Sequence, residues 1–109
     1  MKTKLFLIAA LSTFSASMAM ADGAALYAEK TCIACHGKEG KKPMIPTFPK
    51  LAGQNAAYIE LQMQDIRSGA RSNASSAAMK GVMVTAEGDQ LVSDSDIKEL
   101  ASYLSKIKP

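Results

Sequence analysis

The pentapeptide Cys32-Ile33-Ala34-Cys35-His36 constrains this chain more than any other feature of its sequence. If it forms one helical turn, the two thiols lie at i and i+3 and the imidazole at i+4, so all three project from one face. Cys-x-x-Cys-His is the attachment signature of a c-type haem, in which the thiols bond to the porphyrin edge and the imidazole binds the iron. The chain's only two cysteines and its only histidine lie here. The pentapeptide therefore predicts one haem c, covalently held through Cys32 and Cys35, with His36 as the proximal iron ligand.

Three other chemistries use similar residues and explain less of the sequence. A thioredoxin-like redox pair lies in a βαβ pattern, which is absent from this sequence. A structural zinc site requires four Cys or His ligands, and the chain offers three. A disulfide between Cys32 and Cys35 would suit an exported protein, but it would leave His36 without a role.

Residues 1–21 have the pattern of a secretory signal peptide. Lys2 and Lys4 supply the positive charge, an apolar run follows, and Ala19-Met20-Ala21 fits a signal peptidase site. The apolar run is too short to span a bilayer. We therefore expect cleavage after Ala21, a mature chain without an integral membrane segment, and a periplasmic location.

Residues 22–109 are expected to form one monomeric haem-binding domain. Loss of residues 1–21 lowers the formal net charge from +3 to +1, which gives no electrostatic argument for nucleic acid or a membrane surface as partner. A domain this small buries a limited share of its surface. The porphyrin would complete its core, so we expect the haem-free chain to be largely unfolded.

Apolar spacing and capping residues predict an all-α domain of about four short helices joined by loops rich in proline and glycine. Asp22 is expected to cap a first helix that runs into the Cys-x-x-Cys-His segment. Segment 37–49 contains three prolines and two glycines, which exclude regular helix or sheet, and residues 72–78 are expected to form a loop or a weak helical turn.

Two longer helices are expected in the second half of the chain. One would begin near Gln54-Asn55 and stop at Gly69, with an apolar stripe of Ile59, Met63, Ile66 and Ala70 that is widened by Tyr58 and Leu61. The last helix would begin after a capping box formed by Ser93 and Asp96. Its expected buried stripe consists of Ile97, Leu100, Ala101 and Leu104.

The other iron ligand must be sought among the methionines, because no second histidine exists. Met/His ligation is usual in electron-carrying cytochromes. Met44 is very close to His36 along the chain, and Met63 falls in a helical core stripe. We therefore expect Met79, which follows a flexible small-residue segment, to be the axial ligand, with Met83 as the alternative.

The second ring nitrogen of His36 also needs a hydrogen-bond acceptor to orient the imidazole. A backbone carbonyl is the common solution, and the proline-rich loop after the motif is its obvious source. Pro49 is the expected acceptor, with Pro46 as the second candidate.

Together these residues resemble class I c-type cytochromes, both small monohaem bacterial proteins and single domains of dihaem periplasmic cytochromes. Segment 48–54 is similar to the one whose proline carbonyl receives the imidazole N–H, and segment 77–80 is similar to the approach to the axial methionine. The resemblance implies the cytochrome c fold around one haem. It also implies that the terminal helices cross at a contact made by Gly23, Tyr27, Leu100 and Tyr103.

Segment 84–91 departs from this resemblance, because it makes the distance from Met79 to Ser93 longer than the family usually shows. As the axial ligand, Met83 fits better when the spacing is measured back from Ser93. The Ala-Ala-Met-Lys context favours Met79 as the axial ligand, and an insertion after Met83 would then account for the longer distance to Ser93.

The expected function is one-electron transfer between redox proteins, without enzymatic activity. A six-coordinate iron leaves no site for substrate, so electrons would pass through an exposed haem edge near Cys35. Acidic redox partners would dock there through four lysines: Lys38, Lys41, Lys42 and Lys50. The alternatives are a five-coordinate haem protein for small-ligand sensing or peroxide chemistry, and a haem subunit of a larger oxidoreductase.

Overall fold

The computed structural model describes residues 22–109, so the expected signal peptide lies outside the described residues. Within this range the chain forms five α-helices and one short 3-10 helix. They are α1 (Gly23–Glu29), α2 (Cys32–His36), η1 (Lys38–Gly40), α3 (Ala56–Ser68), α4 (Ser76–Met83) and α5 (Asp94–Ser105). The described residues contain no β-strand, only an isolated bridge between Val84 and Gln90. The all-α prediction is confirmed, with five α-helices in place of about four.

The first helix is shorter than predicted. The Asp22 side chain caps it by accepting the N–H of Ala24 at 3.1 Å, as expected. The prediction that this helix runs into the Cys-x-x-Cys-His segment is wrong, because Thr31 adopts a left-handed conformation (φ 65°). Helix α2 is therefore a separate single turn.

Helix α3 has the predicted ends and a narrower buried face than predicted. Asn55 caps it by accepting the N–H of Tyr58, and Gly69 (φ 86°) ends it. Tyr58 and Leu61 are each 53% exposed, so the prediction that they widen the buried stripe is wrong. At 100° per residue they project from other sides of the helix than the three buried positions, which are Ile59, Met63 and Ile66.

Helix α5 begins and packs as predicted. The Ser93 hydroxyl accepts the N–H of Asp96 at 3.1 Å, and the Asp96 carboxylate accepts the N–H of Ser93 at 3.0 Å. These two bonds satisfy N–H groups that a helix N-terminus otherwise leaves without partners. All four expected core positions of this helix, Ile97, Leu100, Ala101 and Leu104, are buried.

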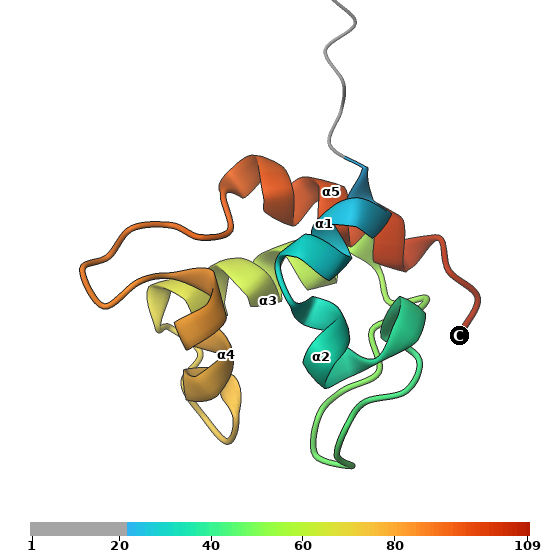
Figure 1. Ribbon diagram of the computed structural model, residues 1–109, viewed down its shortest axis with the longest axis horizontal. Coiled ribbons are helices and arrows are strands. Elements are labelled where there is room, and N and C mark those ends of the chain that lie inside the picture. Colours follow the sequence, from blue (N-terminus) through green and yellow to red (C-terminus); the bar gives the residue numbers. More distant parts are fainter. Residues whose placement is uncertain (1–21) are drawn as a thin grey trace, which may run out of the picture.

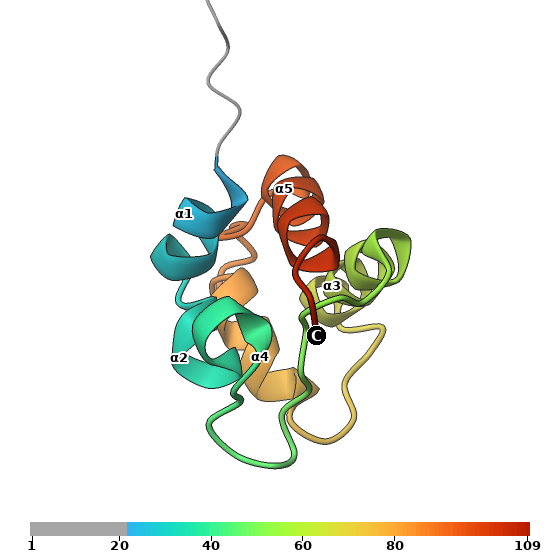
Figure 2. The same cartoon turned by 90° about the vertical axis from the view of Figure 1, so that its right-hand side faces the viewer.

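The helices are arranged around a core in which α5 is the central element. Helix α5 packs against both α1 and α3, and α3 also packs against α4. Figures 1 and 2 show α1 beside α5 at one end of the molecule, with α2 and α4 at the other end. The Tyr27 and Tyr103 rings lie 5.9 Å apart between the terminal helices, as the resemblance implied. This arrangement places α2, which is the Cys-x-x-Cys-His turn, and α4 on the same side of α5.

Candidate functional site

Helix α2 coincides with the Cys-x-x-Cys-His segment and is bounded by two left-handed positions, Thr31 before it and Gly37 (φ 79°) after it. A single helical turn therefore carries Cys32, Cys35 and His36 at i, i+3 and i+4. Both thiols are free. In residues 22–109 no group of three or more Cys, His, Asp or Glu side chains is placed to hold a metal ion. The turn thus offers two free thiols and one imidazole.

Cys32 lies against the apolar core, although the residue as a whole is only partly buried. Burial raises the pKa of the Cys32 thiol to about 11, and the neighbouring Cys35 adds to the rise. The thiol is therefore neutral at physiological pH. The position of this side chain against the apolar core suits a residue that bonds covalently to a largely apolar group.

His36 is buried, with 8% of its surface exposed, and its ring orientation is fixed by one hydrogen bond. Nδ1 lies 2.9 Å from the carbonyl oxygen of Pro49. A carbonyl oxygen only accepts, so Nδ1 carries the proton and Nε2 keeps its lone pair. The ring of Phe48 lies 6.3 Å from the imidazole. This is the arrangement that a metal-ligating histidine requires.

The loop between α2 and Pro49 folds back on the motif, which explains how Pro49 reaches His36. The N–H of Met44 donates to the carbonyl of Cys35 at 2.8 Å. A Cβ atom on Gly37 would lie 2.0 Å from the carbonyl oxygen of Lys42, so only glycine fits where the loop crosses itself. The loop is therefore a defined connection that returns the proline carbonyl to the imidazole.

Tyr27 makes a contact with this site that the sequence did not indicate. Its hydroxyl donates to the carbonyl of Gly37 at 2.5 Å, directly after His36. The two residues are ten positions apart and separated by the break at Thr31. The resemblance implied only the contact of Tyr27 between the terminal helices, and no sequence pattern identifies the hydrogen-bond partner of a hydroxyl across such a break.

The four methionines of the described chain differ in environment. Met44 is 65% exposed on the loop, and Met63 is buried in the core face of α3. Met79 and Met83 lie one turn apart on α4. Met79 is partly buried and packs against the core, whereas Met83 is 1% exposed and is among the largest fully buried side chains.

Segment 84–91 forms a closed turn that rejoins the chain at Met83. The N–H of Thr85 donates to the carbonyl of Asp89 at 2.9 Å. The N–H groups of Leu91 and Val92 both donate to the Met83 carbonyl, at 2.9 and 3.2 Å. The extra residues are thus accommodated within one turn between α4 and α5.

The four lysines expected to surround the haem edge are exposed, and one of them has an acidic neighbour. Lys41 lies 3.6 Å from Glu39, which is too exposed a pair to contribute much stability. The same loop exposes two apolar side chains, Met44 and Ile45. The four exposed lysines are Lys38, Lys41, Lys42 and Lys50.

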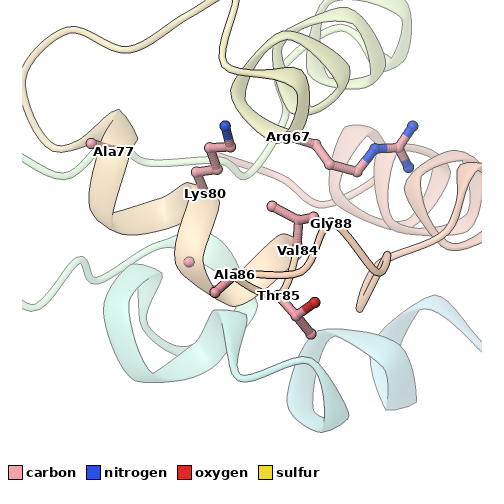
Figure 3. A pocket seen from close by; sticks show the side chains of 8 residues that line it. Arg67, Ala77, Lys80, Val84, Thr85, Ala86 and Gly88 are labelled. Atoms are coloured by element: carbon pink, nitrogen blue, oxygen red, sulfur yellow. The ribbon is translucent and has the colours of Figure 1, made fainter.

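A cavity of about 630 Å³ lies between α4, the 84–91 turn and Arg67 of α3 (Figure 3). Its two cationic side chains, Arg67 and Lys80, extend in different directions. Arg67 is already paired with Asp94 and donates to the Val92 carbonyl. The cavity therefore lacks convergent polar groups and belongs to none of the predicted site residues.

No helix in residues 22–109 is long and apolar enough to cross a membrane.

The family model described as "Cytochrome c" matches residues 20–108. Cytochrome c4 of Azotobacter vinelandii is 40% identical over 78 residues, which cover 72% of this chain and 37% of that longer protein. Cytochrome c-554(548) of Halomonas halodenitrificans is 39% identical over 75 residues, which cover 69% of this chain and 82% of the relative.

Cytochrome c-553 of Nitratidesulfovibrio vulgaris is 33% identical over 101 residues, which cover 92% of this chain and 91% of the relative. The family carries covalently bound haem c, and Cys32, Cys35 and His36 fit its attachment motif. The free thiols on one turn and the imidazole with an available Nε2 also fit that group. This chain belongs to the cytochrome c family, and its cofactor is haem c.

Proposed function

We propose that this protein is a one-electron carrier whose haem iron is ligated by His36 on one side and by Met79 on the other. The observation that carries the proposal is the hydrogen bond from His36 Nδ1 to the Pro49 carbonyl, at 2.9 Å. It holds the imidazole in the tautomer that directs the Nε2 lone pair away from the loop. When bound, the haem supplies the reversible one-electron change at iron.

The Pro49 carbonyl and the burial of the ring would together set how strongly His36 binds iron when the haem is present. The Pro49 carbonyl polarises the Nδ1–H bond and so makes Nε2 a better donor. Burial of the ring to 8% exposure limits competition by water for the same proton. The imidazole of His36 is thus held in one tautomer and one orientation.

The surroundings of α4 support Met79 as the axial ligand. Met83 is enclosed by protein atoms, with 1% exposure, so almost none of its side chain is open to contact with a further group. Met79 is only partly buried at the edge of the same core. Met83 remains the alternative, because it lies on the same face one turn later and fits the spacing from Ser93 better.

The exposed surface beside the motif supports docking of an acidic redox protein. Four lysines lie in or just after the loop that covers α2, and Met44 and Ile45 add exposed apolar area to that loop. Lysines steer association, whereas apolar contacts keep a complex together. The lysines are Lys38, Lys41, Lys42 and Lys50.

The proposed location is the periplasm, and the proposed class is an electron carrier without enzymatic activity. The signal-peptide pattern of residues 1–21 supports export, with residues 22–109 acting in the periplasm as a carrier without enzymatic activity. A six-coordinate iron would leave no coordination position for a substrate.

Absorption spectra of the haem-loaded protein, oxidised and reduced, test the proposal. We expect low-spin spectra in both states, a far-red band from thioether bound to ferric iron, and slow reaction of the ferrous protein with CO. High-spin spectra with rapid CO binding would instead indicate the five-coordinate sensing or peroxide function.

A further inference from the structure

We propose that Tyr27 is a positioning residue for the iron ligand His36, acting through the carbonyl of Gly37. The inference rests on the proposed role of His36 as the proximal ligand. It means that Tyr27, which also packs in the core, influences the properties of the iron.

The first step is the firmness with which Tyr27 itself is held. Its side chain is 2% exposed, and its ring lies 5.9 Å from that of Tyr103 on α5, tilted by 53°. Helix α1 approaches α5 so closely at Gly23 that a Cβ atom there would lie 2.4 Å from Tyr103 Cβ. The Tyr27 hydroxyl is therefore presented from a fixed frame formed by the two terminal helices.

The second step is the position of the acceptor. The Gly37 carbonyl follows His36 directly and receives two donors, the Tyr27 hydroxyl at 2.5 Å and the N–H of Gly40 at 3.1 Å. The first bond joins α1 to the end of α2, and the second closes η1. The Gly37–Lys38 peptide group, one residue after His36, is thus held by donors from both α1 and η1.

The third step links this peptide to the imidazole. The loop that begins at Gly37 ends at Pro49, whose carbonyl accepts from His36 Nδ1. Tyr27 therefore fixes the start of the loop, and the imidazole bonds to its end. Without the hydroxyl, a shift of the Gly37 peptide moves the His36 backbone and the proline carbonyl relative to each other, which lengthens the Nδ1–H···O bond.

A weaker bond at Nδ1 has a defined consequence at the metal. The imidazole becomes a poorer electron donor through Nε2, and ferric iron loses more stabilisation than ferrous iron. The reduction potential of a Tyr27→Phe variant should consequently be more positive than that of the unmodified protein.

The test compares haem-loaded Tyr27→Phe with haem-loaded Tyr103→Phe. The first variant keeps the ring and loses the hydroxyl that contacts Gly37. The second loses the hydroxyl from the other ring of the same pair. Histidine labelled with a heavy nitrogen isotope makes the readout unambiguous, because His36 is the only histidine in the chain.

In the ferrous state, we expect solvent exchange of the His36 Nδ1 proton to accelerate about tenfold in Tyr27→Phe, since loss of one buried hydrogen bond shifts a local opening equilibrium by about that factor. The Gly40 N–H should accelerate with it, whereas the buried N–H of Leu100 in α5 should keep its rate. The reduction potential should rise. Tyr103→Phe should leave the His36 proton and the potential unchanged.

Two results would overturn the inference. One is an unchanged His36 proton or an unchanged potential in Tyr27→Phe. The other is equal acceleration at His36 and Leu100, which would mean general destabilisation. Failure of the proposed ligation would be seen separately, as an unmodified protein whose spectra lack a low-spin histidine-ligated iron.

Discussion

Gly23 of α1 and Tyr103 of α5 approach each other so closely that no side chain larger than hydrogen fits at position 23. A Cβ atom there would lie 2.4 Å from Tyr103 Cβ and 2.8 Å from the backbone carbonyl oxygen of Glu99. One of these neighbours is backbone and the other is the rigid first atom of a side chain, so neither can yield by a rotamer change. The crossing of the terminal helices therefore depends on this glycine.

Gly23→Ala should lower the free energy of unfolding of the haem-loaded protein by about 1–3 kcal/mol, the usual cost of overpacking a core. Thermal or urea unfolding followed by circular dichroism measures the change. Gly81→Ala is the matched control, because nothing lies within 4 Å of a Cβ atom there. That variant should be neutral or stabilised by up to about 1 kcal/mol, since alanine is the better helix former. Equal stability of the two variants would contradict the packing described for the helix crossing.

Met79→Ala and Met83→Ala should affect different properties of the protein. Met79→Ala should abolish the far-red band of the ferric protein, because it removes the proposed axial thioether. Met83→Ala should retain the band and lose about 2–5 kcal/mol of stability, because a fully buried side chain is truncated. Absorption spectra and urea unfolding separate the two effects. Loss of the band in Met83→Ala alone would assign the ligand to Met83.

Stability at high pH should depend on Tyr27. Burial raises the pKa of its hydroxyl from 10.0 to about 12, so the folded protein holds this proton more tightly than the unfolded chain. The resulting stabilisation is complete below pH 10 and is lost progressively as the pH rises towards 12. Tyr27→Phe should therefore show a shallower decline in unfolding free energy between these values.

Tyr58→Phe is the control for this titration, because that ring is 53% exposed. It should retain the decline of the unmodified protein, measured by urea unfolding at several pH values. A Tyr27→Phe protein whose stability declines as steeply as the unmodified one would show that the buried hydroxyl is not responsible.

The lysines beside the motif should govern reaction with anionic oxidants. Lys38→Gln and Lys42→Gln should each slow oxidation of the ferrous protein by ferricyanide a few-fold at low salt and weaken the dependence of the rate on ionic strength. Lys98→Gln, an exposed position on α5, should leave both unchanged. Stopped-flow absorbance gives the rates. A salt-independent rate in the unmodified protein would remove the argument for an electrostatic docking surface.

Much of this architecture could be predicted because it is encoded locally. The capping box of Ser93 and Asp96, the cap at Asp22 and the stop at Gly69 each depend on residues within one helical turn. The buried positions of α5 were all predicted, because they follow the regular spacing of apolar residues along a single helix.

The features that could not be predicted depend on contacts distant in sequence or on backbone choices that several residues can make. Threonine rarely adopts the left-handed conformation of Thr31, so nothing in the sequence marked the break between α1 and α2. Tyr58 and Leu61 are apolar enough for a core, but α4 and α5 pack against the face of α3 that carries Ile59, Met63 and Ile66, and the sides that carry Tyr58 and Leu61 are exposed. The hydrogen bond from Tyr27 to Gly37 could be identified only in the folded structure, because it joins two helical segments across the break at Thr31.

The mass of the intact protein under denaturing conditions, together with its colour, tests the central claim most directly. Exported protein should carry one haem that survives denaturation, and Cys32→Ala combined with Cys35→Ala should abolish that added mass and leave the chain largely unfolded. A colourless protein that folds cooperatively at the mass of the polypeptide alone would contradict the account.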